Sequence, residues 1–195
     1  YASATVTITK KAVTISVADN GKVYGEADPT LADATMSGQI TGELTAVALG
    51  VTREEGEDVG TYTISTSLTK AGLEDTYTDY TFTVGTGTFT ITAAAAAGLG
   101  LSATAYSGEY DGEPHSITAS ATVTEGTTLY YTTTAPDAEG NFSEGTEWST
   151  TNPAYTHVAE TPVTVYVKAE NSNYETAYAS ATVTITKKAV TISVA

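Results

Sequence analysis

The eighteen-residue sequence YASATVTITKKAVTISVA occupies positions 1–18 and recurs without a change at positions 178–195. Threonine and serine alternate with Val13 and Ile15 in its second half, and a period of two is typical of a β-strand with one buried face. Two unrelated segments would not share eighteen consecutive residues. The identity therefore predicts a tandem repeat with a period of 177 residues, since position 178 repeats position 1.

The repeat also gives the expected domain boundaries, because its two ends fall inside strands that should belong to neighbouring copies. We expect five segments: the final strand of a preceding repeat at residues 1–10, a first β domain at residues 11–92, an Ala-rich linker at residues 93–98, a second β domain at residues 99–186, and the first strand of the next repeat at residues 187–195. Only Lys187 and Lys188 separate successive periods, and so short a link predicts stacked modules with little rotational freedom. The chain is thus expected to be an internal segment of an extended repeat array.

Period-two alternation continues through the first domain. It appears in AVTISVA from position 12, in GTYTIST from position 60 and in YTFTVGTGTFTIT from position 80. Turn-forming clusters separate these stretches, at positions 19–21, 28–29, 56–60 and 85–87. Short strands at this spacing predict a β-sandwich, a barrel or a β-grasp-like sheet. Residues 31–36 fit either one helical turn or a short strand.

The second domain carries the same alternation in five stretches. They are LSATAY from position 101, HSITASATV from 115, TTLYYTTT from 127, VTVYVKAE from 163 and YASATVTIT from 178. Six or seven short strands separated by polar loops predict an immunoglobulin-like β-sandwich. Because the chain has no cysteine pair, Trp148 and the tyrosines are expected to fill its core. The predicted fold is therefore all-β, with two tandem small β domains.

Composition and charge exclude several classes of function. The formal net charge of −15 repels nucleic-acid phosphates and anionic lipid headgroups, so neither nucleic acid nor a membrane surface is expected as a partner. The absence of cysteine excludes disulfides, zinc–thiolate sites and thiol nucleophiles. No apolar stretch reaches about 18 residues, so no membrane insertion is expected in this segment. No basic region followed by an apolar stretch opens the chain, so any targeting signal is expected elsewhere.

Two motifs of the first domain are specific, KVYGEADPTL from position 22 and REEGEDVGTYTI from position 53. With AVTISVAD from position 12 and FTVGTGTFTIT from position 82, they resemble the YGX-type MBG domain, a repeat of bacterial surface proteins and adhesins. In the second domain, YDGEPHSITA from position 110, VYVKAENSNYE from 165 and ATVTITK from 181 resemble the Ig-like repeats that accompany it in giant bacterial surface proteins. The resemblance implies a stalk or adhesive array displayed outside a bacterial cell, and it brings no catalytic residues.

Elementary conformational preferences give the two specific motifs a structural role. Gly25 permits a backbone angle that other residues avoid, Pro29 fixes a turn, and Tyr24 offers a large ring with a hydrogen-bonding tip. Gly56 opens a second turn, and Tyr62 follows it at the start of a strand. We therefore expect both motifs to serve folding.

Catalysis is not expected. Hydrolysis would need paired carboxylates in a cleft or a nucleophile with a neighbouring base. His115 follows a proline at a strand start and His157 follows a Tyr-Thr segment, and such positions favour surface or turn packing. The sequence contains no Gly-rich phosphate loop, Ser-centred elbow or metalloprotease helix. We expect no catalytic residues, no cofactor and no cofactor-binding residues.

Metal binding is not expected either, although acidic loops are present. Asp137, Glu139, Asn141 and Ser143 alternate as the oxygen ligands of a calcium loop would. The loop departs from an EF-hand, because Phe142 stands where the turn needs glycine. A solvated loop is therefore predicted.

Two further polar clusters are predicted to be structural. One is an acidic run, expected to be a repelling, solvated turn, at Glu54, Glu55, Glu57 and Asp58. The other holds the residue types of an intramolecular isopeptide bond, at Lys168, Glu170, Asn171 and Asn173. Such a bond needs a lysine that faces its partners, and here all four residues follow one another along the chain. We expect neither a metal site nor an isopeptide bond.

Four aromatic residues of the second domain offer a sugar-stacking platform: Tyr130, Tyr131, Trp148 and Tyr155. Tyr130 and Tyr131 point to opposite faces of one strand, so at most one of them joins a given patch. Core filling is predicted for one of these two and for Trp148, because a sandwich without cysteines needs large rings. A binding patch is the alternative.

These observations predict a structural repeat module of a long extracellular bacterial surface protein, an adhesin stalk or fibre that projects a binding tip from the cell. The expected partners are neighbouring repeats of the same chain, with host or microbial surface glycans or proteins as further candidates. The expected location is the bacterial cell surface. The alternative is a carbohydrate- or host-glycoprotein-binding module that acts through the second domain. An enzyme is not expected, because the chain lacks the side chains that catalysis needs.

Overall fold

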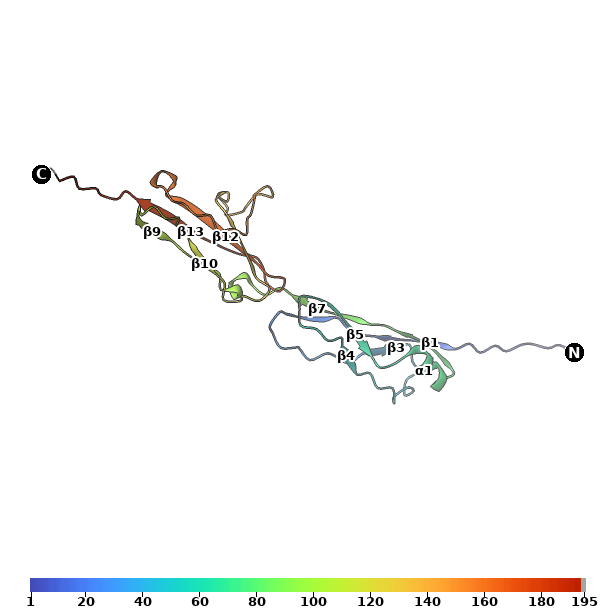
Figure 1. The fold of residues 1–195 in the computed structure, drawn as a ribbon. Coiled ribbons are helices and arrows are strands. Elements are labelled where there is room, and N and C mark those ends of the chain that lie inside the picture. The colour runs from blue at the N-terminus through green and yellow to red at the C-terminus, as the bar shows by residue number, and fades with distance from the viewer. Residues whose placement is uncertain (194–195) are drawn as a thin grey trace. The chain divides into compact units, whose positions relative to one another are not determined.

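The computed structural model describes residues 1–193, which form two compact units (Figure 1). Unit 1 comprises residues 1–92, and unit 2 begins at Ala93. Within the described residues the regular structure consists of thirteen strands, one short α-helix and two 3-10 helices. The prediction of an all-β fold is therefore confirmed. None of these helices has the length and apolar composition needed to cross a bilayer.

Unit 1 contains two β-sheets. Its elements are β1 (Lys11–Ser16), β2 (Asn20–Val23), β3 (Thr35–Ser37), β4 (Val51–Arg53), β5 (Gly60–Thr66), α1 (Lys70–Thr76), β6 (Tyr80–Val84) and β7 (Gly87–Thr92). One sheet has the order β3-β1-β6 and the other the order β2-β7-β5-β4. β1 pairs in parallel with β6, and β2 pairs in parallel with β7, so the same two chain segments run through both sheets.

Each sheet of unit 1 buries an apolar cluster. Val13, Ile15 and Phe82 lie in the cluster under β1 and β6, and Phe89 lies in the cluster under β5 and β7. Val17 packs against both clusters, so the two are continuous. The burial follows the period-two alternation predicted from the sequence, and two packed sheets are the arrangement of a β-sandwich.

Two local features of unit 1 were undecided or missed at the sequence level. Residues 35–37 form the short strand β3, so the segment 31–36 does not contain a helical turn. The helix α1 was not anticipated, because Leu73 is the only large apolar residue in KAGLEDT and gives no helical periodicity. Its first turn is capped by Thr69, whose hydroxyl accepts a hydrogen bond from Gly72 N at 3.2 Å.

Unit 2 also contains two sheets. Its elements are η1 (Ala96–Leu99), β8 (Ser102–Thr104), β9 (Tyr106–Glu109), β10 (Thr118–Ser120), β11 (Thr128–Thr132), η2 (Val158–Glu160), β12 (Val163–Glu170) and β13 (Ala177–Thr186). The sheets have the orders β10-β8 and β11-β12-β13-β9. The core is mainly aliphatic, with Ile117, Val165, Val167, Val183 and Ile185 buried together. Each of the five alternating stretches predicted from the sequence contains a strand.

The segment expected as an Ala-rich linker, residues 93–98, is hydrogen-bonded to unit 2. Ala94 N donates to the carbonyl of Asn173 at 3.0 Å, and Glu175 N donates to the carbonyl of Ala94 at 2.8 Å. The segment continues into η1, whose last residue, Leu99, is fully buried beside Ala169. Backbone hydrogen bonds and a buried anchor hold this segment against β12, β13 and the turn between them.

Candidate functional surfaces

Four charged side chains of unit 1, Lys22, Asp28, Arg53 and Glu57, form what we call the ion cluster. Lys22 lies on β2 and Arg53 ends β4, while the two carboxylates come from the loops that follow these strands. Lys22 Nζ lies 2.7 Å from Asp28 Oδ1 and also contacts Glu57 Oε2. Arg53 Nε lies 2.5 Å from Asp28 Oδ2, and Arg53 Nη2 lies 2.5 Å from Glu57 Oε1. Each cation therefore bridges both carboxylates.

The two cations of the ion cluster are buried, whereas its carboxylates face solvent. The side chains of Lys22 and Arg53 are only 4% and 11% exposed. The guanidinium carbon of Arg53 lies 4.8 Å from the centre of the Phe89 ring, a cation–π arrangement on top of the core. A buried cation needs a paired anion, because an unpaired charge is costly away from water. Asp28 and Glu57 supply that pairing and so hold their loops to the sheet.

Mutual attraction shifts the proton affinity of all four groups. The hydrogen bond from Arg53, followed by that from Lys22, lowers the pKa of Asp28 to about 2. The hydrogen bond from Lys22 lowers the pKa of Glu57 as well. Hydrogen bonds to Asp28 raise the pKa values of both Lys22 and Arg53. All four groups are therefore charged at neutral pH.

The loop between β4 and β5 closes around Arg53. Arg53 Nη1 donates to the carbonyl of Gly56 at 2.7 Å and to that of Glu54 at 2.9 Å. Gly56 has a φ of +148°, and a Cβ at this position would lie 2.1 Å from the Tyr62 ring. The Tyr62 hydroxyl in turn donates to the carbonyl of Asp58 at 2.8 Å. Glycine is therefore required where REEGEDVGTYTI turns back on itself.

The acidic run at Glu54, Glu55, Glu57 and Asp58 is solvated, as the sequence predicted, but it is not simply repelling. Glu57 is paired with two cations in the ion cluster. Glu54 Oε2 accepts a hydrogen bond from Thr63 N at 3.3 Å. Sequence reasoning missed these partners because it treated the acidic residues alone. The available signal was a cation in each of the two specific motifs, Lys22 in one and Arg53 in the other.

Unit 2 carries an aromatic cluster, formed by Phe142, Trp148, Tyr166 and Tyr178, on the outer face of its four-stranded sheet. The ring centroid of Phe142 lies 4.9 Å from that of Trp148, 5.6 Å from that of Tyr166 and 5.4 Å from that of Tyr178. Tyr166 belongs to β12 and Tyr178 to β13, whereas Phe142 and Trp148 belong to the long loop between β11 and β12. The cluster therefore attaches that loop to the sheet, and Tyr178 leaves 55% of its surface open to solvent.

Lys168 extends the aromatic cluster along β12. Its Nζ lies 4.9 Å from the centre of the Tyr130 ring and 5.0 Å from that of the Trp148 ring. It also lies 2.7 Å from Glu170 Oε1. Asn171 donates instead to the turn that precedes β11, at 3.0 Å. Lys168 and Asn171 thus have separate partners, and their placement gives no support to an isopeptide bond.

The four aromatic residues that the sequence offered for a sugar-stacking platform or for the core lie in different environments. Tyr131 lies in the core, which confirms core filling by one of the Tyr130–Tyr131 pair. Tyr130 lies on the opposite face, beside Lys168. The prediction that Trp148 fills the core is wrong, because valine and isoleucine side chains occupy the space between the sheets and Trp148 packs outside. Tyr155 forms a bridge with the chain near β10 and packs against the edge of the core.

Both histidines take part in packing and turn formation. The His115 ring stacks on the Tyr106 ring with centroids 4.0 Å apart, and its Nε2 lies 2.9 Å from Asp111 Oδ1. His157 precedes η2, and its backbone N–H donates to Glu160 Oε2 at 2.8 Å. This hydrogen bond, followed by one from Thr156 N at 3.0 Å, lowers the pKa of Glu160. The two histidines are therefore placed as the sequence indicated, in surface and turn positions.

The loop of residues 137–143, whose residue pattern suggested calcium ligands, is closed by hydrogen bonds from its backbone to the Asp137 carboxylate. Asp137 Oδ1 accepts hydrogen bonds from Asn141 N at 2.7 Å and from Glu139 N at 3.1 Å. One carboxylate oxygen is therefore committed to the turn. Among residues 1–193, no group of three or more His, Cys, Asp or Glu side chains is placed to hold a metal ion.

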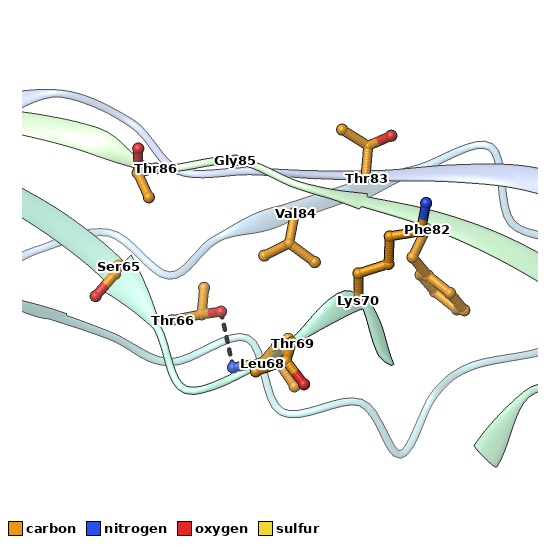
Figure 2. A pocket seen from close by; sticks show the side chains of 10 residues that line it. All are labelled: Ser65, Thr66, Leu68, Thr69, Lys70, Phe82, Thr83, Val84, Gly85 and Thr86. Atoms are coloured by element: carbon orange, nitrogen blue, oxygen red, sulfur yellow. Dashed lines mark hydrogen bonds between the residues drawn. The ribbon is translucent and has the colours of Figure 1, made fainter. Parts of the chain in front are cut away.

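An open groove of about 460 Å³ lies on unit 1 beside the start of α1 (Figure 2). Phe82 and Val84 line it from β6, and Lys70 contributes its one charged side chain. The dashed line in Figure 2 marks the hydrogen bond from Leu68 N to the Thr66 hydroxyl, 3.0 Å long. Its remaining lining is dominated by serine and threonine, which gives the groove no acid–base pair for catalysis.

Comparison with known proteins gives one family match. Residues 13–90 match the family model of the MBG domain (YGX type), which confirms the resemblance of unit 1. Both the ion cluster and the turn at Gly56 lie within the matched residues. No curated protein matches the chain.

Among solved structures, the chain is similar to the crystal structure of Dscam1 isoform 9.44, N-terminal four Ig domains (with zinc). The sequence identity is 17% and the TM-score is 0.38. The match covers 92% of this chain and 47% of that chain, so this chain spans about half the length of the structure it matches. At this TM-score the match assigns no fold family to either unit.

Proposed function

We propose that this chain is a structural repeat module of a long extracellular bacterial surface protein, an adhesin stalk or fibre. The observation that carries the proposal is that the motif residues within the family match stabilise the fold. Lys22 and Arg53 pair with Asp28 and Glu57, and the absence of a side chain at Gly56 leaves space for the Tyr62 ring. These residues hold loops to a sheet, which is a structural role.

The literal repeat supports the same proposal. Residues 1–18 and 178–195 are identical, and a strand sequence shared by both ends of a period is what an uninterrupted array of copies requires. On this proposal the module acts mechanically, its partners are neighbouring repeats, and its location is the bacterial cell surface. The module is proposed to be neither an enzyme nor a cofactor-binding protein.

Two measurements test the array. Small-angle scattering on chains of one, two and three periods should give a maximum dimension that grows almost linearly with copy number. Growth with about the square root of length, as for a flexible chain, contradicts a stalk. Antibodies against residues 11–186 should label intact cells of the bacterium that encodes the chain. Labelling only after lysis contradicts the surface location.

A second candidate function is carbohydrate binding at the aromatic cluster of unit 2. The observation that favours it is the exposed ring of Tyr178 beside Phe142 and Trp148, since exposed aromatic faces stack on sugar rings. A glycan screen with the wild-type chain should be positive, and Tyr178→Ala should abolish the signal. Tyr1→Ala is the matched control, because Tyr1 is the repeat counterpart of Tyr178 and is fully exposed. A blank screen removes this candidate and leaves the structural module.

A further inference from the structure

The first two strands of unit 1 run alongside its last two strands in a single register. β1 pairs in parallel with β6, with Lys11 opposite Tyr80. β2 pairs in parallel with β7, with Asn20 opposite Phe89. Both pairs of opposite residues are 69 positions apart, so the register does not change where the two segments pass from one sheet to the other. We call this continuous pairing the parallel ladder, which joins residues 11–23 to residues 80–92.

Hydrogen bonds also join the two segments between the two sheets. Gly85 N donates to the carbonyl of Ile15 at 2.9 Å, where the pairing of β1 with β6 ends. Thr88 N then donates to Asp19 Oδ1 at 2.7 Å, so a side chain connects the segments just before the pairing of β2 with β7 begins. The cross-connections of the parallel ladder therefore continue through its middle.

A backbone hydrogen bond closes each end of the parallel ladder. Lys11 N donates to the carbonyl of Asp79 at 2.9 Å, where the chain enters the regular structure of unit 1. Tyr24 N donates to the carbonyl of Thr92 at 2.8 Å, where the chain leaves the unit. Figure 1 labels β1 and β7 at opposite ends of unit 1. A pull on the chain therefore reaches the parallel ladder from its two opposite ends.

The direction of the two segments decides how the parallel ladder responds to that pull. Both segments run the same way, so tension at Lys11 and at Thr92 drags them past each other along their length. The hydrogen bonds of a parallel pair are evenly spaced along the strands, so sliding loads all of them together. Separation of the two segments from one end would instead break the bonds one after another.

We propose that the parallel ladder is a shear clamp that carries tension along the chain. Core packing adds to the resistance, because Val13 and Phe82 lie opposite each other and are 1% and 2% exposed. Sliding must drag these side chains through a close-packed interior. The proposal rests on the proposed function, since a stalk under load is what would use a clamp. It adds which contacts carry the load and in which direction they hold.

Unit 2 presents the same geometry on a shorter scale. β9, near the start of the unit, pairs in parallel with β13, the last strand, with Tyr106 opposite Val183. Ahead of it, Ala94 forms a parallel bridge with Tyr174. In both units, then, a segment near the entry of the chain runs parallel to the segment at its exit. The longer pairing is in unit 1, which is the unit to test.

The test loads the same ladder in two directions. The chain contains no cysteine, so two introduced thiols define where a single folded molecule is held and pulled. K10C with T92C loads the parallel ladder in shear, whereas K10C with T78C pulls the two segments apart from one end. All three positions are exposed. At equal pulling speed we expect the shear direction to need at least about threefold more force, because all the bonds must break together.

Asp19 offers a variant that weakens the parallel ladder and leaves its strands unchanged. D19A removes the hydrogen bond to Thr88 N and should raise the unfolding rate under shear load about fivefold, the factor for one net hydrogen bond. D33A is the matched control, because Asp33 is an exposed carboxylate in the loop between β2 and β3. It should leave that rate unchanged. Circular dichroism establishes that each variant is folded before it is pulled.

Two results overturn the clamp. One is an equal unfolding force in the two directions, and the other is a shear unfolding rate that D19A and D33A change alike. Neither result bears on the proposed function, because scattering and antibody labelling measure length and location and not strength. A chain whose maximum dimension grows linearly with copy number but whose unfolding force does not depend on direction is a stalk without a clamp. A directional force in a chain that fails the scattering test leaves the clamp and removes the stalk.

Discussion

Each unit holds a loop to a sheet with a lysine or arginine, but the two units use different chemistry. In unit 1, Arg53 lies over Phe89 and is paired with two carboxylates. In unit 2, the aromatic cluster holds the loop, and Lys168 lies near the Trp148 ring of that cluster and the Tyr130 ring of β11, paired with Glu170. Loop attachment therefore depends on charge in unit 1 and on ring packing in unit 2. Acid, salt and single substitutions should then affect the two units differently.

The largest effect is expected from removing the ring that supports the ion cluster. Phe89 is fully buried on β7, and Phe89→Ala should lower the free energy of unfolding of unit 1 by about 3–5 kcal/mol, through lost burial and a cavity. Because Trp148 reports only unit 2, a change in the circular dichroism transition without a change in the Trp148 transition assigns the loss to unit 1. Coincident shifts of both signals would show that the two units unfold together.

Removing the cation from each attachment should have unequal effects. Arg53→Met removes one of the two cations that pair with Asp28 and Glu57, and it should lower the melting temperature of unit 1 by several degrees. Lys168→Met keeps an unbranched chain between the rings of Tyr130 and Trp148, so unit 2 should change much less. Scanning calorimetry of the two variants measures both effects. Equal shifts would mean that Lys168 is as important to its loop as Arg53.

Acid should weaken the attachment in unit 1 through Asp28. The pKa of Asp28 is lowered to about 2, below its ordinary value, so its pairing stabilises the folded state above about pH 4. That stabilisation is lost as the pH falls from about 4 to about 2. Asp28→Asn removes the titrating group and should make unit 1 less stable at pH 7 but less sensitive to this fall. Urea unfolding at pH 7, 4 and 2.5 measures the difference between the two slopes, and parallel slopes would contradict the assignment to Asp28.

The contrast between the units also explains what the sequence could predict. Strands were predictable because Val13, Ile15 and Phe89 alternate with threonine along single segments. The ion cluster could not be predicted in this way, because Lys22 and Arg53 are brought to the same two carboxylates only by the sheet order β2-β7-β5-β4. The sequence around the acidic run therefore indicated repulsion, and the cations that pair with Glu57 were missed.

The prediction that Trp148 fills the core was wrong for a different physical reason. A tryptophan can bury its ring in a core or against the outside of a sheet, and its sequence neighbours are the same in both cases. The aliphatic residues of β12 and β13 fill the core, so the ring packs outside on Phe142. The remaining rings of the aromatic cluster lie on strands that are far from Trp148 in sequence, and pairing of these strands was needed to locate the patch.

The smallest effect is expected from the exposed ring of unit 2. Tyr178 leaves more than half of its surface in water, so Tyr178→Ala should lower the stability of unit 2 by only about 1 kcal/mol, which is the scale of an aromatic pair. The loop between β11 and β12 should respond more than the unit as a whole, because Tyr178 packs directly on its anchor Phe142. Limited proteolysis should then cut residues 137–148 faster in the variant, while the Trp148 unfolding midpoint changes little. Tyr1→Ala is the control, since Tyr1 is followed by the same residues as Tyr178 but is fully exposed and should change neither rate nor midpoint. If Tyr178→Ala left the cleavage rate unchanged, Phe142 and Trp148 would hold the loop without the strand residue, and the attachment would reside in the loop and β12 alone.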